Sequence, residues 1–87
     1  MQSNLNWTGS KVDLVELVYA LHNSKIVNTG NVDVKELATH LGKMFNINIE
    51  DKVYRFYQDI KSRKVIKTKF LNTIAENLNQ KMVDEDI

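Results

Sequence analysis

The sequence contains no proline, and its 87 residues include three glycines, Gly9, Gly30 and Gly42. Proline interrupts helices because it lacks a backbone N–H and its ring clashes with the preceding turn. Four stretches of the chain place apolar residues at the i, i+3, i+4, i+7 spacing that is typical of amphipathic helices. Together these features predict a mostly α domain of four helices.

The expected helices span about residues 10–23, 34–45, 49–62 and 69–83. Each begins near a residue that can accept a hydrogen bond from a free backbone N–H in the first turn. The predicted caps are Ser10, Asp33 with Glu36 completing a capping box, Asn48 or its neighbour, and Thr68. Glu50 and Asp51 are expected at the positive end of the third helix.

Each helix has an apolar face, and Trp7 is expected to pack back onto the bundle just before the first helix. Gly42 lies on the buried side of the second helix, where a small residue allows another helix to approach closely. The predicted apolar positions are Leu14, Leu17, Val18 and Leu21; Val34, Leu37, Ala38, Leu41 and Phe45; Ile49, Val53, Phe56 and Ile60, with Tyr57 on the flank; and Phe70, Leu71, Ile74, Ala75, Leu78 and Met82.

The length of the chain predicts one domain over residues 1–87, with flexible ends at about 1–4 and 84–87. No apolar run approaches the roughly 18 residues that a membrane span needs. The start of the chain lacks the features of a signal peptide. Cysteine is absent, which excludes disulfides and cysteine-based zinc sites and is compatible with a cytoplasmic location.

Positive charge is concentrated in residues 52–69, which hold seven basic residues and one acid, Asp59. The rest of the chain holds five bases and ten acids. A basic segment on an acidic remainder favours a surface that binds a polyanion.

The third helix is a candidate recognition helix, because the segment from Asp33 to Ile60 resembles a helix-turn-helix with a lengthened turn. A period of 100° per residue places its polar side chains opposite its apolar face. Asp51 and Asp59 oppose DNA binding, since carboxylates repel phosphates. The candidate base-contacting residues are Lys52, Arg55, Gln58 and Ser62. The candidate phosphate contacts are Lys61, Arg63, Lys64, Lys67 and Lys69.

A different class of function also fits: a protein-interaction or dimerisation module that binds no nucleic acid. We expect neither an enzyme nor a cofactor. His22, at a helix C-terminus, and the exposed His40 are isolated and show no metal-binding spacing. The three tyrosines, Tyr19, Tyr54 and Tyr57, are expected to pack with their hydroxyls at the rim.

Three strings resemble the C-terminal region of the RteC family: LNWTGSKVDLVELVYALHNS, NTGNVDVKELATHLGKMFNI and YRFYQDIKSRKVIKTKFLNTIAENL. The sharpest part is WTGSKVDLVELVYALH at residues 7–22, supported by the SRK and TKFL pattern at residues 62–71. These are regulatory proteins of Bacteroides-type conjugative transposons that carry tetracycline resistance.

The resemblance implies a transcriptional regulator that binds double-stranded DNA upstream of excision genes and promotes their expression. It also implies a winged-helix-like domain, here the C-terminal part of a longer protein. Only residues 63–67 separate the last two helices, so the wing is vestigial, absent, or built from residues 24–32 and the segment around Leu5 to Trp7. The fold expectation is therefore a four-helix domain with helix-turn-helix or degenerate winged-helix character. A replication accessory domain that binds DNA at an origin, and possible self-association, stay open.

Overall fold

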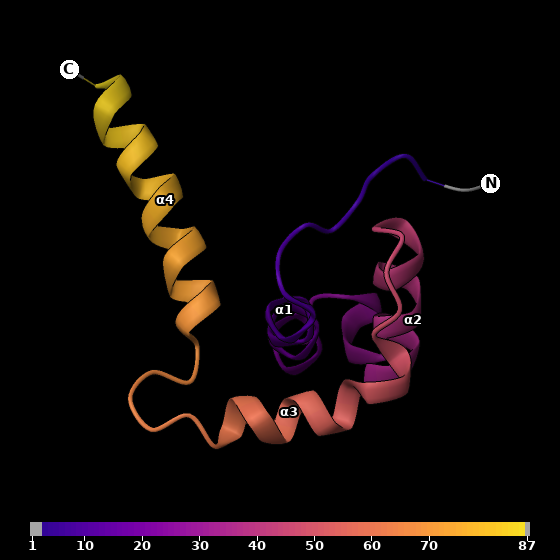
Figure 1. The fold of residues 1–87 in the computed structure, drawn as a ribbon. Coiled ribbons are helices and arrows are strands. Elements are labelled where there is room, and N and C mark those ends of the chain that lie inside the picture. The colour runs from indigo at the N-terminus through magenta and orange to yellow at the C-terminus, as the bar shows by residue number, and fades with distance from the viewer. Residues whose placement is uncertain (1–2, 87) are drawn as a thin grey trace.

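The computed structural model describes residues 3–86, and every regular element in that range is helical (Figure 1). The α-helices are α1 (Lys11–Asn23), α2 (Val34–Met44), α3 (Val53–Lys61) and α4 (Lys69–Glu85). Two single 3₁₀ turns, η1 (Asn28–Gly30) and η2 (Glu50–Lys52), precede α2 and α3. The prediction of four helices is confirmed.

None of the stretches considered for a wing contains a strand. Residues 24–32 hold η1, residues 63–67 form bends and irregular backbone, and the segment around Leu5 to Trp7 is irregular. Within residues 3–86 there is no β-hairpin beside α3. At the C-terminus, α4 continues through Glu85, while the flexibility predicted for residues 1, 2 and 87 lies outside the described residues.

The first two helices begin at the caps that the sequence predicts. Ser10 Oγ accepts a hydrogen bond from the backbone N–H of Asp13 at 3.1 Å. Asp33 Oδ1 accepts one from the backbone N–H of Glu36 at 2.7 Å. Each bond satisfies one of the backbone donors that a first helical turn leaves unpaired.

Thr68 is the N-cap residue of α4, and Ile49, the neighbour of Asn48, is that of η2, but the side-chain cap bonds expected for the last two helices do not form. Asn48 Nδ2 donates to Asp51 Oδ2 at 3.0 Å, and η2 and α3 have no side-chain cap. Thr68 precedes α4, but its hydroxyl bonds with Asn72 Oδ1 at 3.1 Å and not with the backbone. In both cases the side chain has a nearby polar partner other than the helix N-terminus.

The core lies where α1 crosses α2 and α3. The predicted inner faces of these helices are confirmed, and α1 also buries Val15 because it contacts all three of the other helices. The buried apolar residues are Leu14, Val15, Val18, Val34, Leu37, Ala38, Ile49, Val53 and Ile60.

Two close contacts fix the N-terminal segment and the connector after α2. The backbone N–H of Trp7 donates to Phe45 O at 2.9 Å, and its ring contacts Phe45 and Phe70, so it packs onto the bundle as predicted. A Cβ at Gly42 would lie 2.5 Å from the carbonyl oxygen of Ile47. A close approach at Gly42 is therefore present, but the prediction of another helix as the partner is wrong, because the connector after α2 lies there.

Only the first turn of α4 packs on the rest of the domain, and the helix then extends away from it (Figure 1). Phe70 and Leu71 are half-buried, while all described residues from Asn72 onward are exposed. The apolar stripe predicted on this helix exists but does not join the core. None of the described helices is both long enough and apolar enough to cross a membrane.

Candidate nucleic-acid interface

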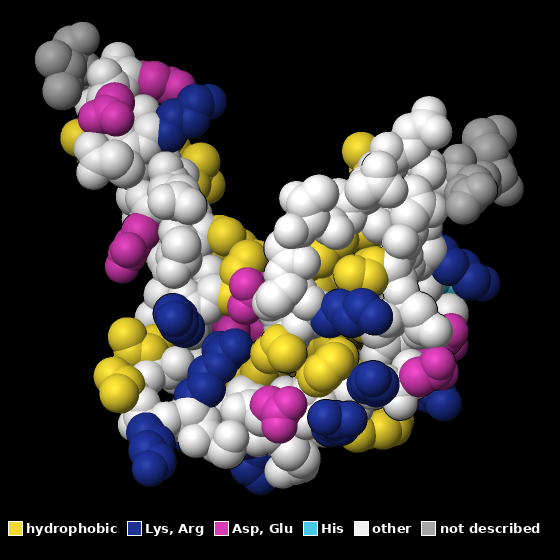
Figure 2. Space-filling view, in the orientation of Figure 1, with side chains coloured by type: hydrophobic (Ala, Val, Ile, Leu, Met, Phe, Trp, Pro, Cys, Tyr) yellow, Lys and Arg dark blue, Asp and Glu magenta, His cyan; other side chains and the backbone are white. Residues whose placement is uncertain are grey.

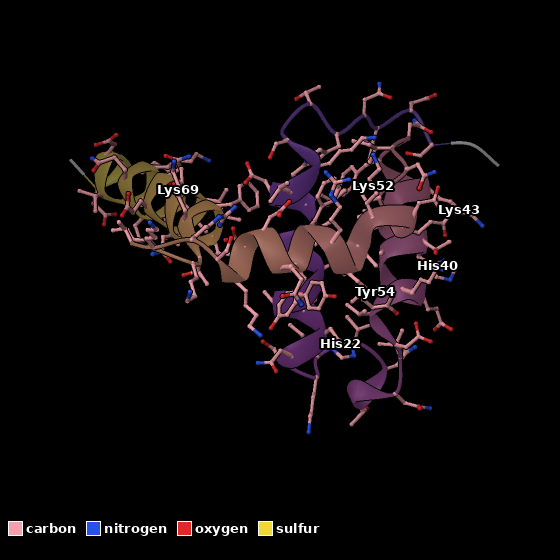
Figure 3. All side chains as sticks on the ribbon, turned by 60° about the horizontal axis from the view of Figure 1, so that its bottom comes forward. His22, His40, Lys43, Lys52, Tyr54 and Lys69 are labelled. Atoms are coloured by element: carbon pink, nitrogen blue, oxygen red, sulfur yellow. The ribbon has the colours of Figure 1, made fainter. Side chains whose placement is uncertain are left out.

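The polar side of α3 faces solvent. Val53 and Ile60 are buried against the core, and the four candidate base-contacting residues are exposed. They occupy different positions along the segment: Lys52 ends η2 before the helix begins, Arg55 and Gln58 lie within α3, and Ser62 follows its last residue. Figure 3 shows Lys52 and Tyr54 near the start of α3 and Lys69 on α4 beyond its end.

Three of these four residues have side chains that can bind a ligand without breaking a contact in the domain. The side chains of Lys52, Arg55 and Gln58 make no hydrogen bond or ion pair within residues 3–86. Ser62 differs, because its hydroxyl donates to the carbonyl oxygen of Asp59 at 2.8 Å and so helps to end the helix. The carboxylates of Asp51 and Asp59 are also exposed and reduce the positive charge of this side.

The structure divides the five candidate phosphate contacts into two groups. The side chains of Lys61, Lys64 and Lys69 are exposed and make no hydrogen bond or ion pair within the described part of the chain. Arg63 and Lys67, in contrast, are held by contacts inside the domain. Three ammonium groups near the end of α3 and the start of α4 are thus available to a ligand.

Arg63 is bound to a buried carboxylate. Its Nη1 atom lies 2.5 Å from Glu16 Oε1, and its Nη2 atom lies 3.9 Å from Asp13 Oδ1. Nη1 also donates to the carbonyl oxygen of Lys67 at 2.7 Å. The Glu16 side chain is 3% exposed, so the guanidinium supplies the countercharge that a buried carboxylate requires.

Glu16 also caps α4 from a distant part of the sequence. Its Oε2 accepts from the backbone N–H of Leu71 at 2.8 Å, and Oε1 lies 3.4 Å from the N–H of Phe70. A negative charge at a helix N-terminus is favourable because it interacts with the helix dipole and with unpaired N–H groups. The sequence analysis missed this role; the one indication was an acid beside the apolar positions of α1.

Lys67 binds back to the start of the loop that joins α3 to α4. Its Nζ donates to the carbonyl oxygens of Lys61 at 2.5 Å and Arg63 at 3.1 Å. Lys61 is the last residue of α3 and Arg63 follows it by two residues, so the cation lies where the negative end of the helix dipole favours it. Residues 62–68 are therefore a loop held by its own basic side chains.

A pocket of about 500 Å³ lies between α1, α3 and the start of α4, and two stacked tyrosines form part of its wall. The ring centroids of Tyr19 and Tyr57 are 4.0 Å apart. Partial burial, and then the neighbouring Tyr54 and Tyr57, raise the pKa of Tyr19 above its ordinary value of 10.0. Lys61 and Lys67 also line this pocket, so cations lie beside its apolar wall.

The two histidines lie on different helices. His22 is in the last turn of α1 and half-buried, and His40 is exposed on α2, as predicted (Figure 3). No group of three or more His, Cys, Asp or Glu side chains in residues 3–86 is arranged to hold a metal ion.

The geometry defines an all-helical domain in which three packed helices present a polar, partly basic side, followed by a projecting fourth helix. The chain belongs to the RteC family: the family model described as RteC protein matches residues 1–86. No curated protein and no solved structure matches the chain. Membership fits a regulatory protein of a conjugative transposon, as the resemblance in the sequence implied.

Proposed function

We propose that this domain binds double-stranded DNA as part of a transcriptional regulator of a mobile genetic element. The observation that carries the proposal is the set of cations without internal partners along α3 and at its end. These are Lys52, Arg55, Lys61, Lys64 and Lys69. They supply the charge that phosphate binding requires, and they are free to supply it without breaking the fold.

The arrangement of the helices supports a helix-turn-helix mode. α1 packs against both α2 and α3, which leaves the polar side of α3 exposed at the edge of the domain. An exposed helix of this kind fits the major groove, where Arg55 and Gln58 are able to make paired hydrogen bonds to base edges. The connector of η2 and the preceding residues lengthens the turn between α2 and α3.

Phosphate binding is assigned to Lys61, Lys64 and Lys69 beside this helix. Their ammonium groups add affinity that depends on salt and not on base sequence. Arg63 and Lys67 contribute in another way, because their internal contacts hold the loop that carries Lys64. In this proposal the domain has no wing, performs no catalysis and needs no cofactor.

The biological role follows from the family. RteC membership favours a regulator that acts on DNA upstream of excision genes and promotes their expression in a cytoplasmic setting. The competing function is a protein-interaction module that binds no DNA, and the exposed apolar side of α4 is the observation in its favour.

Fluorescence anisotropy with labelled DNA from upstream of the excision genes, at several salt concentrations, tests the proposal. We expect binding at low salt. Affinity should decrease with salt, and the slope of log affinity against log salt should become less steep by about 0.9 for each phosphate contact removed. The combined variant Lys61→Gln, Lys64→Gln and Lys69→Gln should show this weaker salt dependence. Lys35→Gln, a change at an exposed lysine on α2, serves as the control.

Arg55→Ala tests the base contacts separately. Loss of one paired contact should weaken binding to the upstream DNA by about 1–3 kcal/mol and leave binding to shuffled DNA nearly unchanged. Absence of binding at low salt, or affinity that none of these variants alters, would refute the proposal.

A further inference from the structure

The apolar stripe of α4 has no cover within residues 3–86. Ile74, Leu78 and Met82 are 40%, 58% and 46% exposed. A turn of 100° per residue places them on one side of the helix with Leu71 and Ala75. Figure 2 shows hydrophobic side chains on the inner side of α4, facing the N-terminal segment across a hollow. Most of the stability of a helix of this length comes from packing, so an exposed stripe calls for a partner.

The charges at the two ends of α4 indicate the direction in which a partner helix runs. Lys67 and Lys69 lie at its start, and Asp84, Glu85 and Asp86 lie at its end. Both sets have the wrong sign for the helix dipole, which favours acids at the N-terminus and bases at the C-terminus. Glu16 offsets the first set within the domain. At the acidic end, Lys81 pairs with Glu85, and Asp84 and Asp86 have no ion pair within residues 3–86.

We infer that α4 pairs in an antiparallel direction with α4 of a second copy of this chain. In that arrangement the acidic end of each helix lies beside the basic start of the other. A parallel pair would instead bring like charges together at both ends. A two-fold axis also lets one surface meet an identical surface, which is the commonest form of homodimer.

The order of side chains along α4 fits this arrangement. One register places Leu71 opposite Met82 of the second copy and Ala75 opposite its Leu78, so apolar side chains meet at these positions and a small residue faces a large one. The charged Glu76 and the polar Gln80 lie on the opposite side of the helix and stay in solvent. DNA does not suit the stripe, because it offers phosphates and not apolar surface.

Sedimentation velocity of the chain, without DNA and from micromolar to millimolar concentration, tests the inference. We expect a monomer–dimer equilibrium. Leu78→Asp should raise its dissociation constant by about tenfold or more, because it places an unpaired charge in the apolar contact. Asn77→Asp adds the same charge away from the stripe, at an exposed side chain that makes no hydrogen bond within residues 3–86, and should leave the constant unchanged. Since both residues are exposed in the monomer, circular dichroism should show equal folding of the two variants.

If the chain stays monomeric at every concentration, the inference is overturned, and the apolar stripe binds a partner other than a second copy. This holds even if the chain still binds DNA. Equal dissociation constants for Leu78→Asp and Asn77→Asp would also overturn it. Because no DNA is present and no α3 residue is changed, the result is independent of the proposed DNA binding.

The direction of pairing is tested by disulfide formation, since the chain contains no cysteine of its own. Two single variants, Leu71→Cys and Met82→Cys, are mixed and oxidised. An antiparallel pair should give the disulfide between positions 71 and 82. The two positions are roughly 16 Å apart along one helix, so a parallel pair would give only 71–71 and 82–82 products. Those products would exclude the antiparallel arrangement.

Discussion

Arg63 Nη1 lies 2.5 Å from Glu16 Oε1, and this ion pair joins the loop after α3 to the middle of α1. The same carboxylate accepts from the backbone N–H of Leu71 in the first turn of α4. One buried acid therefore positions both the basic loop and the projecting helix. The direction of α4 depends on α1, although the two are far apart in the sequence.

Glu16→Gln should destabilise the domain and loosen the start of α4. It removes the charge that pairs with Arg63 and weakens the cap on the backbone of Phe70 and Leu71. We expect the free energy of unfolding to fall by about 2 kcal/mol, the range for hydrogen bonds to charged groups. Urea denaturation measures the fall, and hydrogen exchange should show faster exchange of these two amides. Glu76→Gln, an exposed change on α4, is the control, and equal stability of both variants would contradict the assignment.

Two adjacent bases should respond differently to substitution. Arg63→Gln should lower the free energy of unfolding, because it leaves Glu16 buried without a countercharge. Lys64→Gln should leave stability within about 0.5 kcal/mol of wild type, as expected at an exposed site, and should reduce DNA affinity at low salt. Thermal unfolding and anisotropy titration of both variants measure these effects. A loss of stability in Lys64→Gln would contradict this division.

Local patterns were sufficient to predict most of the fold. The apolar period located the four helices, and Ser10 and Asp33 were identified as caps because a cap and its first turn lie within three residues of each other. Glu16 could not be identified in this way, since its partners lie 47 to 55 residues further along the chain. The sequence also could not predict that the apolar side of α4 is exposed, because an apolar stripe has the same spacing whether or not another element covers it.

For the candidate interface, the sequence could predict which side chains of α3 face solvent, but not which bases are held by contacts inside the domain. The helical period correctly placed Arg55 and Gln58 on the solvent side of α3. Charge alone could not separate Lys64 from Arg63, because both are basic residues of one loop. The difference between them is tertiary: Arg63 reaches the carboxylate of Glu16, and Lys64 reaches no acid within the described residues.

Tyr19 should make stability decline at high pH. Its pKa is raised in the fold, by burial first and then by Tyr54 and Tyr57, so the folded state holds the phenol proton more tightly than the unfolded state does. Its contribution is therefore complete below the ordinary value of 10.0 and is lost as the pH rises above it. Urea denaturation at pH 8 and above pH 10 should show a smaller decline for Tyr19→Phe, which has no phenol proton at this position. An identical decline in both proteins would contradict the prediction.

Gly42→Ala tests the close contact between α2 and the connector that follows it. Alanine favours a helix over glycine by about 1 kcal/mol, which alone would stabilise α2. The new Cβ, however, would lie 2.5 Å from the carbonyl oxygen of Ile47, a backbone atom that cannot move without shifting the connector. Overpacking of this kind costs about 1–3 kcal/mol, so we expect a net loss of stability in urea denaturation.

The same shift should break a specific hydrogen bond. The backbone N–H of Ile47 donates to the carbonyl oxygen of Gly42 at 2.9 Å, and its hydrogen exchange should become faster in Gly42→Ala. Lys43→Ala, at the exposed neighbouring position, should change neither stability nor this exchange by a comparable amount. If Gly42→Ala were instead more stable than wild type, the connector would have to yield to a methyl group, and η2 and α3 behind it would be held less firmly than the structure indicates.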